Sequence, residues 1–223
     1  MTILLAKNLE FQIFEKRSHR YVAGSSLQAE GKPMEAFNLY LKQFPHYSTT
    51  VFEEVLPFLS SRNLEAGEYF LRGGTTCKEI GFVEKGMLRL FYLNDGKEIT
   101  NCFCKENTLT TSYSSLITQK ESDLTIQAIE PSTLIVFSHH ALQQLYEKNL
   151  FWQQLGRLAA ENELMATECH HRFLHDLPAT ERYQQILEED PELLQRVPLN
   201  YLATYLQIAP ETLSRIRRKI SRT

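Results

Sequence analysis

This sequence has few cysteines and no long apolar run. Its 223 residues hold four cysteines, too few for a disulfide scaffold, so we expect a reducing compartment and take the cytoplasm as the location. Residues 1–6 contain an apolar patch of four residues without a basic lead, which is too short for a signal peptide. No run approaches the roughly 20 apolar residues of a membrane span. We therefore expect a cytoplasmic protein without a membrane partner.

Motifs of known catalytic chemistry are also missing. There is no Ser/His/Asp order, no P-loop and no dinucleotide-binding glycine pattern, and Gly73-Gly74 is expected to be a turn. Residues 62–138 contain no histidine. This argues against a metal enzyme built on a barrel, because such a site needs converging histidine and carboxylate ligands. The sequence thus predicts no enzyme, no catalytic residue and no cofactor.

The cysteines and histidines do not predict a metal site. Cys102 and Cys104 lie on one face of an expected strand, and we interpret them as packing residues. His171 and His175 are four residues apart on one helix face, with Cys169 nearby. They lack a carboxylate or third ligand at a defined spacing, so we expect no metal here.

Positive charge is scarce overall and is concentrated at one end of the chain. The net charge is −3 and the pI is about 6.2, so the protein is not basic throughout. The last ten residues nevertheless contain five cations and no acid. Such a run suits the C-terminal end of a helix dipole, and it also suits the phosphates of a nucleic acid. These cations are Arg215, Arg217, Arg218, Lys219 and Arg222.

Residues 198–219 show helical periodicity in two short blocks around a sharp turn. Pro210 suits the first position of the second helix, because its missing N–H would be unpaired there. The small side chain of Ala203 allows the two helices to approach closely. This pattern predicts a helix-turn-helix. Its expected inner positions are Leu199, Leu202, Ala203 and Leu206 in the first helix, and Leu213 and Ile216 in the second.

The outer face of the second helix carries residues that can read DNA. Glu211, Ser214 and Arg215 are spaced i, i+3 and i+4, so they share one face. Arginine pairs with guanine through two hydrogen bonds, and glutamate accepts from cytosine. We predict that these three residues read bases. The predicted phosphate contacts are Thr212, Arg217, Arg218 and Lys219.

The middle of the chain reads as a β-rich unit. A helical pattern opens at Met34, and another helix is expected over 48–59. From Arg62 to Ser138, short β-like runs alternate with turns, and Asp95-Gly96 is a strong hairpin signal. Many short strands at this spacing predict a sandwich, a jelly roll or a small barrel. Residues 1–33 read as an extension to which we assign no role.

A helical period returns after His139 and continues to about Asp176. A three-four spacing from Leu155 to Cys169 leaves two interpretations open: a helix packed on its own barrel, or a seam between two subunits in which Asn162 sets the register. A further helix is expected over 179–189, ended by Asp190-Pro191.

This order of elements resembles the Crp-Fnr family of bacterial transcription regulators. The resemblance rests on GEYFLRGG at 67–74, IGFVEKGMLRLFY at 80–92 and VPLNYLATYLQIAPETLSRIRRK at 197–219. It implies an α+β fold in which a double-stranded β-helix (jelly-roll) sensor is joined by a long dimerisation helix to a C-terminal helix-turn-helix. It also implies a homodimer on a two-fold operator of double-stranded DNA, with RNA polymerase as a partner if the protein is an activator. The implied domains are 34–148, 149–176 and 177–223.

The sequence departs from family members that bind cyclic AMP. Those members use Gly-Glu and then Arg-Ser or Arg-Thr, whose arginine neutralises the cyclic phosphate. Here Lys105-Glu106 and Glu121-Ser122 stand at the corresponding places, and a carboxylate would repel the phosphate. A small-molecule effector in the barrel stays a candidate partner. The candidate pocket residues are Glu106, Thr111, Ser112 and Ser122, although many loop hydroxyls simply bond the local backbone.

The C-terminal region departs from the family in two smaller ways. A full wing is expected to be absent or reduced, because only residues 190–197 separate the helix-turn-helix from the preceding helix. Gln207 stands where glycine is common in the turn, and Ala209 where a hydroxyl N-cap is expected.

The sequence therefore predicts a DNA-binding transcription regulator that responds to an effector other than cyclic AMP, or to none. Two alternatives remain: a cyclic-nucleotide-responsive regulator, and a barrel-type ligand-binding protein that acts by protein contact without binding DNA.

Overall fold

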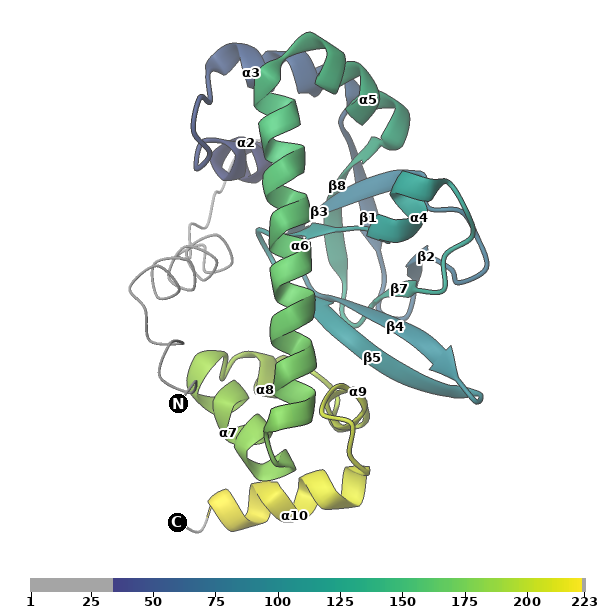
Figure 1. The fold of residues 1–223 in the computed structure, drawn as a ribbon, viewed down its shortest axis with the longest axis vertical. Coiled ribbons are helices and arrows are strands. Elements are labelled where there is room, and N and C mark those ends of the chain that lie inside the picture. Colours follow the sequence, from purple (N-terminus) through teal and green to yellow (C-terminus); the bar gives the residue numbers. More distant parts are fainter. Residues whose placement is uncertain (1–33, 222–223) are drawn as a thin grey trace, which may run out of the picture.

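The computed structural model describes residues 34–221, so the predicted extension over 1–33 and Arg222 lie outside the described residues. Short helices precede a β-sandwich, a long helix runs beside it, and short helices close the far end (Figure 1). The helices are α2 (Glu35–Leu41), α3 (Thr49–Val55), the 3-10 turn η1 (Leu56–Phe58), α4 (Tyr113–Thr118), α5 (His139–Lys148), α6 (Leu150–Asp176), α7 (Ala179–Glu189), α8 (Leu193–Arg196), α9 (Leu199–Tyr205) and α10 (Pro210–Ile220). The strands are β1 (Ser60–Leu64), β2 (Tyr69–Leu71), β3 (Glu79–Lys85), β4 (Leu88–Asn94), β5 (Lys97–Cys104), β6 (Leu109–Thr110), β7 (Thr125–Ala128) and β8 (Ser132–Ser138).

Two four-stranded antiparallel sheets make the sandwich. One has the order β1-β8-β3-β6 and the other the order β2-β7-β4-β5. Their inner faces meet at side chains such as Phe82, Leu88, Ile126 and Leu134, all of which are fully buried. The central strands β3, β4 and β8 each bury four residues in a row, because both faces of these strands are covered, and the two-sheet arrangement confirms the predicted jelly-roll architecture.

The predicted hairpin between β4 and β5 is present. Asp95 and Gly96 have φ of 51° and 75°, so both central residues adopt the left-handed conformation of a type I′ turn. Asn94 pairs with Lys97 across the turn. Further along, the register shifts between Leu90 and Phe91, which marks a β-bulge in the strand pair.

The long helical run is not continuous. Asn149 is extended (φ −147°, ψ 129°), and its side-chain oxygen accepts the Phe151 N–H at 3.0 Å, so it ends α5 and caps α6. The helical period expected from His139 to about Asp176 is thus interrupted at this residue, where the boundary between the implied domains 34–148 and 149–176 also falls. An asparagine with a local hydrogen bond outweighs the periodicity on either side.

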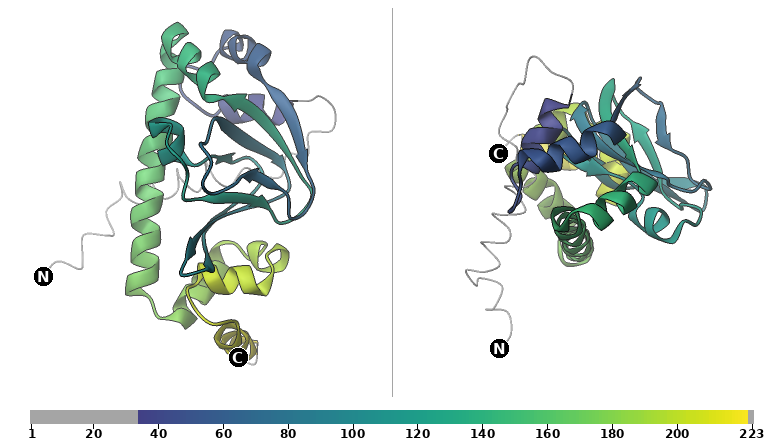
Figure 2. Two further views of the ribbon diagram at one scale, coloured as in Figure 1. Left: turned by 90° about the vertical axis from the view of Figure 1, so that its right-hand side faces the viewer. Right: turned by 90° about the horizontal axis from the view of Figure 1, so that it is seen from above.

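Helix α6 has two different environments along its length. Its first turns bury Phe151, Trp152 and Leu155 against the sandwich. Beyond them, apolar residues are partly exposed, and Leu164 is 60% exposed. Figure 2 shows α6 lying along one side of the sandwich towards the C-terminal helices. The helix thus packs on its own sandwich at one end and leaves much of its apolar surface uncovered.

Three short elements escaped the sequence analysis. Strand β1 is largely polar, helix α4 lies in a stretch expected to be a hydroxyl-rich loop, and α8 follows Asp190-Pro191 closely. Each is too short for a periodic pattern to develop. Between residues 177 and 221 the structure contains helices and no strand, as expected for an absent wing.

A second apolar core holds the C-terminal helices together. It combines Ile186 of α7 with residues of α9 and α10, and it includes Met87 from the turn between β3 and β4. None of the helices between residues 34 and 221 combines the length and the apolar character that crossing a membrane would require.

Candidate nucleic-acid interface

Helices α9 and α10 pack as a helix-turn-helix. Leu202, Ala203 and Leu206 of α9 and Leu213 of α10 are almost completely buried, and Ile216 is 8% exposed. They are five of the six inner positions that the apolar spacing predicts, and the sixth, Leu199, is partly buried against the same core. Ala203 has no exposed surface, in agreement with a close approach of the two helices at this residue.

The turn between the helices depends on an unusual backbone conformation. Gln207 has φ of 50°, in the left-handed region that glycine adopts most easily. Its neighbour Ile208 donates an N–H to the Ala203 carbonyl at 3.0 Å, which closes the end of α9. Ala209 gives α10 no side-chain cap, and Pro210 occupies the first turn, where its missing N–H costs nothing.

The predicted base-reading residues share the outward face of α10. Glu211, Ser214 and Arg215 are all exposed. The Ser214 hydroxyl donates to the Pro210 carbonyl at 3.0 Å, and Arg215 Nη2 donates to Thr212 Oγ1 at 3.1 Å. Both contacts are local and exposed, so a stronger acceptor such as a base can replace them.

The predicted phosphate contacts extend the same surface. Arg217, Arg218 and Lys219 are exposed in the last turns of α10, and Thr212 is partly buried beside Arg215. In Figure 1, α10 forms the end of the molecule farthest from α3 and α5. The helix is therefore accessible along its cationic face.

Helix α9 docks on the outer face of strands β4 and β5. Thr100 and Thr204 share a hydrogen bond of 2.7 Å between their hydroxyls. The rings of Phe103 and Tyr205 lie 5.4 Å apart, edge to face. The first helix of the helix-turn-helix is thus fixed directly to a sheet of the sandwich.

A buried arginine lies at this junction. Arg89 of β4 is 1% exposed, with its guanidinium carbon 3.6 Å from the ring centre of Tyr201 and 4.0 Å from that of Phe91. Its Nη2 donates to Glu98 at 2.6 Å and to Gln127 at 3.0 Å. Two aromatic faces and one carboxylate therefore hold the cation between the sheet and α9.

Arg196 of α8 makes a second junction with the sandwich. Its guanidinium donates to both carboxylate oxygens of Glu106 at 2.8 and 2.9 Å, to Glu130, and to Glu192 at 2.8 Å. Glu106 also accepts the Gly86 N–H at 2.9 Å. Two turns of the sandwich, which contain Glu106 and Glu130, thus meet at one arginine, and Gly86 of a third turn bonds Glu106.

This network changes the acidity of its central carboxyl group. Burial alone would raise the pKa of Glu106. Hydrogen bonds from Arg196 and from the backbone N–H groups of Glu106 and Gly86 outweigh burial, so the pKa of Glu106 lies below its usual range. Beside it, Lys105 Nζ pairs with Asp190 at 2.6 Å. Two consecutive residues of the β5–β6 turn therefore bind the C-terminal helices.

The four candidate effector-pocket residues do not share one site. The hydroxyls of Ser112 and Ser122 are fully buried and joined at 2.8 Å, and Ser122 also donates to the Leu124 carbonyl. Thr111 donates to the Glu79 carbonyl at 3.0 Å. These three residues lie around α4, whereas Glu106 faces Arg196 and serves the junction with α8.

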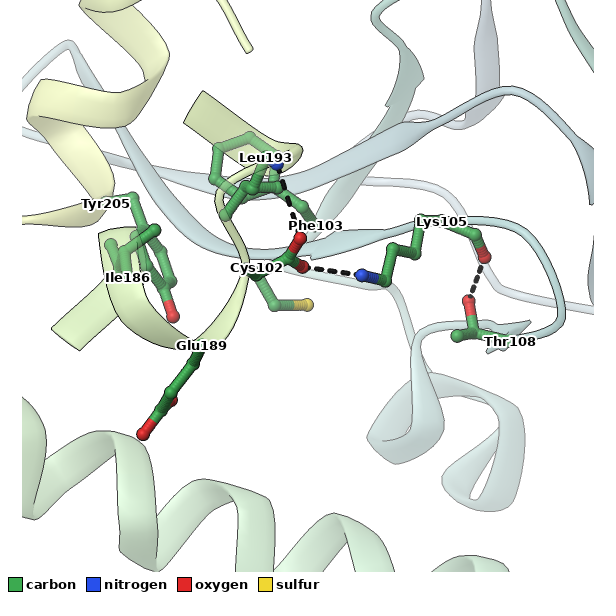
Figure 3. A pocket seen from close by; sticks show the side chains of 9 residues that line it. Cys102, Phe103, Lys105, Thr108, Ile186, Glu189, Leu193 and Tyr205 are labelled. Carbon is green, nitrogen blue, oxygen red and sulfur yellow. Dashed lines mark hydrogen bonds and ion pairs between the residues drawn. The ribbon is translucent and has the colours of Figure 1, made fainter. Parts of the chain in front are cut away.

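A cleft separates β5 from the C-terminal helices (Figure 3). Its volume is about 210 Å³. Its walls are formed by Cys102, Phe103, Lys105, Thr108, Ile186, Glu189, Asp190, Leu193 and Tyr205. The cleft thus lies beside the contacts that hold α9.

Sequence reasoning missed Arg89 and Arg196. Arg89 interrupts the apolar run of β4, and a charge in such a run indicates a buried partner. Arg196 lies in a four-residue helix without a periodic pattern, so no sequence signal identifies it.

Residues 61–149 match the family model described as the cyclic nucleotide-binding domain. Among curated proteins, none matches this chain by sequence.

Three solved structures are similar to this chain. FixK2 from Bradyrhizobium japonicum is 19% identical, with a TM-score of 0.63 over 73% of this chain and 84% of that protein. A Crp/Fnr family transcriptional regulator from Eubacterium rectale is 16% identical, with a TM-score of 0.66 over 81% and 88%. CLP from Xanthomonas campestris, described as a c-di-GMP responsive global regulator, is 18% identical, with a TM-score of 0.61 over 78% and 92%. The chain shares their fold.

Proposed function

We propose that this chain, whose fold is that of Crp/Fnr transcription regulators, is itself a sequence-specific DNA-binding regulator. The observation that carries the proposal is the outward face of α10, where Glu211, Ser214 and Arg215 are exposed. The opposite face of α10 packs on α9. Glutamate and arginine at this spacing can accept from cytosine and donate twice to guanine in the major groove. The cations that follow them fit the flanking phosphates.

The regulator acts as a homodimer in this proposal. Met165, a partly buried apolar residue of α6 beyond the sandwich contacts of Leu155 and Leu158, fits a second copy of the same helix. A two-fold dimer presents two α10 helices to half-sites about one helical turn apart. The partner is therefore double-stranded DNA with a two-fold operator, and RNA polymerase is a further partner if bound protein activates transcription.

The effector, if there is one, differs from cyclic AMP. Residues 109–128, around α4, contain no arginine that could neutralise a cyclic phosphate. The hydroxyls of Ser112 and Ser122 are already bonded to each other inside the fold. Both features disfavour a cyclic nucleotide, although residues 61–149 have the matching fold.

A binding selection tests this function. Random double-stranded DNA is selected with the full chain, and affinities are then compared for the enriched site and its single-base variants. Arg215→Ala should weaken the best site by about 1–3 kcal/mol and relax preference at one base pair. Lys219→Ala should weaken all sequences alike and lower the salt dependence by about one phosphate contact.

Two outcomes count against the proposal. If no sequence is enriched, the chain does not bind DNA specifically, and a ligand-binding protein acting by protein contact becomes the better reading. If a site is enriched but Arg215→Ala leaves its base preference unchanged, α10 is not the reading helix.

A further inference from the structure

We propose that the cleft between β5 and the C-terminal helices binds a small organic cation, an ammonium group carried on an apolar body. The cleft lies outside the sandwich, so it differs from the candidate effector pocket that the sequence placed inside the barrel. Its walls come from β5 and the turn after it on one side, and from α7, α8 and α9 on the other. Small-molecule sites occur preferentially at junctions of this kind.

The size of the cleft limits its occupant. Its volume is about 210 Å³. Sites for drug-sized ligands have volumes of roughly 300–1,000 Å³. The occupant is therefore smaller than such ligands, and one aromatic ring with a short amine chain has a suitable size.

An apolar wall can receive the body of the ligand. Phe103 of β5, Ile186 of α7 and Leu193 of α8 line the cleft from three elements. Ile186 is 6% exposed, and Phe103 and Leu193 are partly buried. Phe103 packs edge to face on Tyr205, so two aromatic rings border the space. Aromatic faces attract cations, which favours an ammonium group near these rings.

The charged groups of the lining favour a cation over an anion. They are two carboxylates, Glu189 and Asp190, and one ammonium, Lys105, which leaves one net negative charge. Lys105 Nζ pairs with Asp190 Oδ2 at 2.6 Å, so its charge is already balanced. The Glu189 carboxylate accepts a hydrogen bond from the neutral Gln185 amide at 2.9 Å. The negative charge of Glu189 is thus the one that a bound cation would balance.

Tyr205 supplies a second acceptor. Burial first, and then the negative groups Cys102, Glu189 and Asp190, raise the pKa of the Tyr205 phenol to about 12. The phenol therefore keeps its proton, and its oxygen can accept a hydrogen bond from an ammonium. Figure 3 shows the Tyr205 hydroxyl, the Cys102 sulfur and the Glu189 carboxylate directed towards the same open space. A primary ammonium has three donors for the Glu189 carboxylate and the Tyr205 oxygen.

An occupant of the cleft would contact both sides of the junction. Because Phe103 belongs to β5 and Tyr205 to α9, a ligand packed on both would favour the docked arrangement of α9. An effect of such a ligand on DNA binding rests on the proposed function, whereas the binding site itself does not.

Equilibrium dialysis with labelled phenethylamine tests the site. Full-length protein without DNA should bind one molecule per chain. Unlabelled 3-phenylpropionate, an anion of similar shape, should not compete. Unlabelled 2-phenylethanol, which has the same body without the charge, should bind at least about tenfold more weakly, as expected when a charged hydrogen bond is lost.

Two variants and one control identify the residues. Glu189→Gln should lower the affinity about tenfold, between the values for an exposed ion pair and for a buried charged hydrogen bond. Tyr205→Phe keeps the ring and should lower it about 2–10-fold. Glu188→Gln changes a neighbouring exposed carboxylate that does not line the cleft, and it should bind like the wild type.

Four results would overturn the site. They are an absence of saturable phenethylamine binding, equal competition by 3-phenylpropionate, an equal loss in Glu188→Gln and Glu189→Gln, and wild-type affinity in both Glu189→Gln and Tyr205→Phe. Melting curves verify that each variant is folded. Because the dialysis contains no DNA, its result is independent of the binding selection, and the two proposals can fail separately.

Discussion

At the scale of single residues, Gln207 holds a backbone conformation that its side chain disfavours. A φ of 50° in a non-glycine residue costs about 1 kcal/mol or more, and glycine adopts it freely. The Gln207 side chain is exposed, so removing it sacrifices little packing. Glycine also loses more entropy on folding, which offsets part of the gain.

We expect Gln207→Gly to stabilise the protein by up to about 1 kcal/mol, and Gln207→Val to destabilise it by at least as much. The melting temperatures of the three proteins check this. If valine proved as stable as glutamine, the left-handed conformation would not exist in solution.

Residues also show what the sequence could predict. Glu211, Ser214 and Arg215 could be grouped because all three lie on one helix, where spacing alone defines a face. Glu106 could not be assigned correctly. Its partner Arg196 is 90 residues away along the chain, and only the folded arrangement of turns brings them together. A sequence pattern identifies residues that share a face of one helix or strand, but it does not identify contacts between residues far apart along the chain.

At the scale of elements, α8 is a short helix with a large role. It presents Arg196 to carboxylates from two turns of the sandwich, with the guanidinium side chain only 18% exposed. Removing one partner of such a network leaves carboxylates without their donors. Through the ion pairs of Arg196, helix α8 therefore connects the C-terminal helices to the sandwich.

Arg196→Gln should destabilise the protein by about 1.5–3 kcal/mol, the typical contribution of hydrogen bonds to charged groups. The matched control is Arg157→Gln, which removes an exposed pair with Glu161 four residues along α6. That pair should be worth only about 0.3–0.5 kcal/mol. Chemical denaturation measures the free energy of unfolding of both variants. Equal decreases would contradict a stronger, partly buried ion-pair network at Arg196.

The limits of some helices could be predicted from the sequence, and those of others could not. The limits of α7 and the start of α10 were predicted well, because proline and apolar spacing coincide there. The periodicity alone does not mark the end of α5, because the run is helical on both sides of Asn149, although the implied domain boundary at 148/149 falls there. Helix α4 was lost among hydroxyl residues that favour turns, yet Ser115 and Leu116 are buried against the sandwich. Burial in the tertiary structure therefore outweighs the low helix propensity of this segment.

At the scale of the whole molecule, the junction between sandwich and C-terminal helices should be sensitive to acid. The pKa of Glu106 is lower in the folded protein than the unfolded value of about 4.3. Its carboxylate therefore adds stability above that pH, and this contribution is lost as the pH falls through the folded pKa.

Glu106→Gln should accordingly be less stable than the wild type near pH 7 and should lose less stability on acidification below about pH 4.3. Glu211→Gln, which changes an exposed carboxylate on α10, serves as the control and should follow the wild-type pH profile. The measurement is the free energy of unfolding as a function of pH. Parallel profiles for Glu106→Gln and the wild type would show that this carboxylate does not couple folding to protons.

The uncovered length of α6 makes a second prediction for the assembled molecule. Met165→Glu places a charge on the partly buried apolar face of α6 and should convert the proposed dimer into monomers. Leu164→Glu changes an exposed leucine on a different face of the same helix and should leave the dimer intact. The molecular mass of each variant, measured by sedimentation, shows which of the two faces of α6 forms the interface. Dissociation by Leu164→Glu alone would move the interface to the other face.

Met87 has a consequence for how such proteins can be recombined. It belongs to the sandwich by position, yet it is fully buried in the core of the C-terminal helices, together with partly buried Phe103 and Ile129. A graft of α7–α10 onto a foreign sandwich would need an apolar residue in the β3–β4 turn and carboxylates equivalent to Glu106 and Glu130. Helices α7–α10 are therefore not a freely exchangeable module, because their stability depends on residues in three turns of the sandwich.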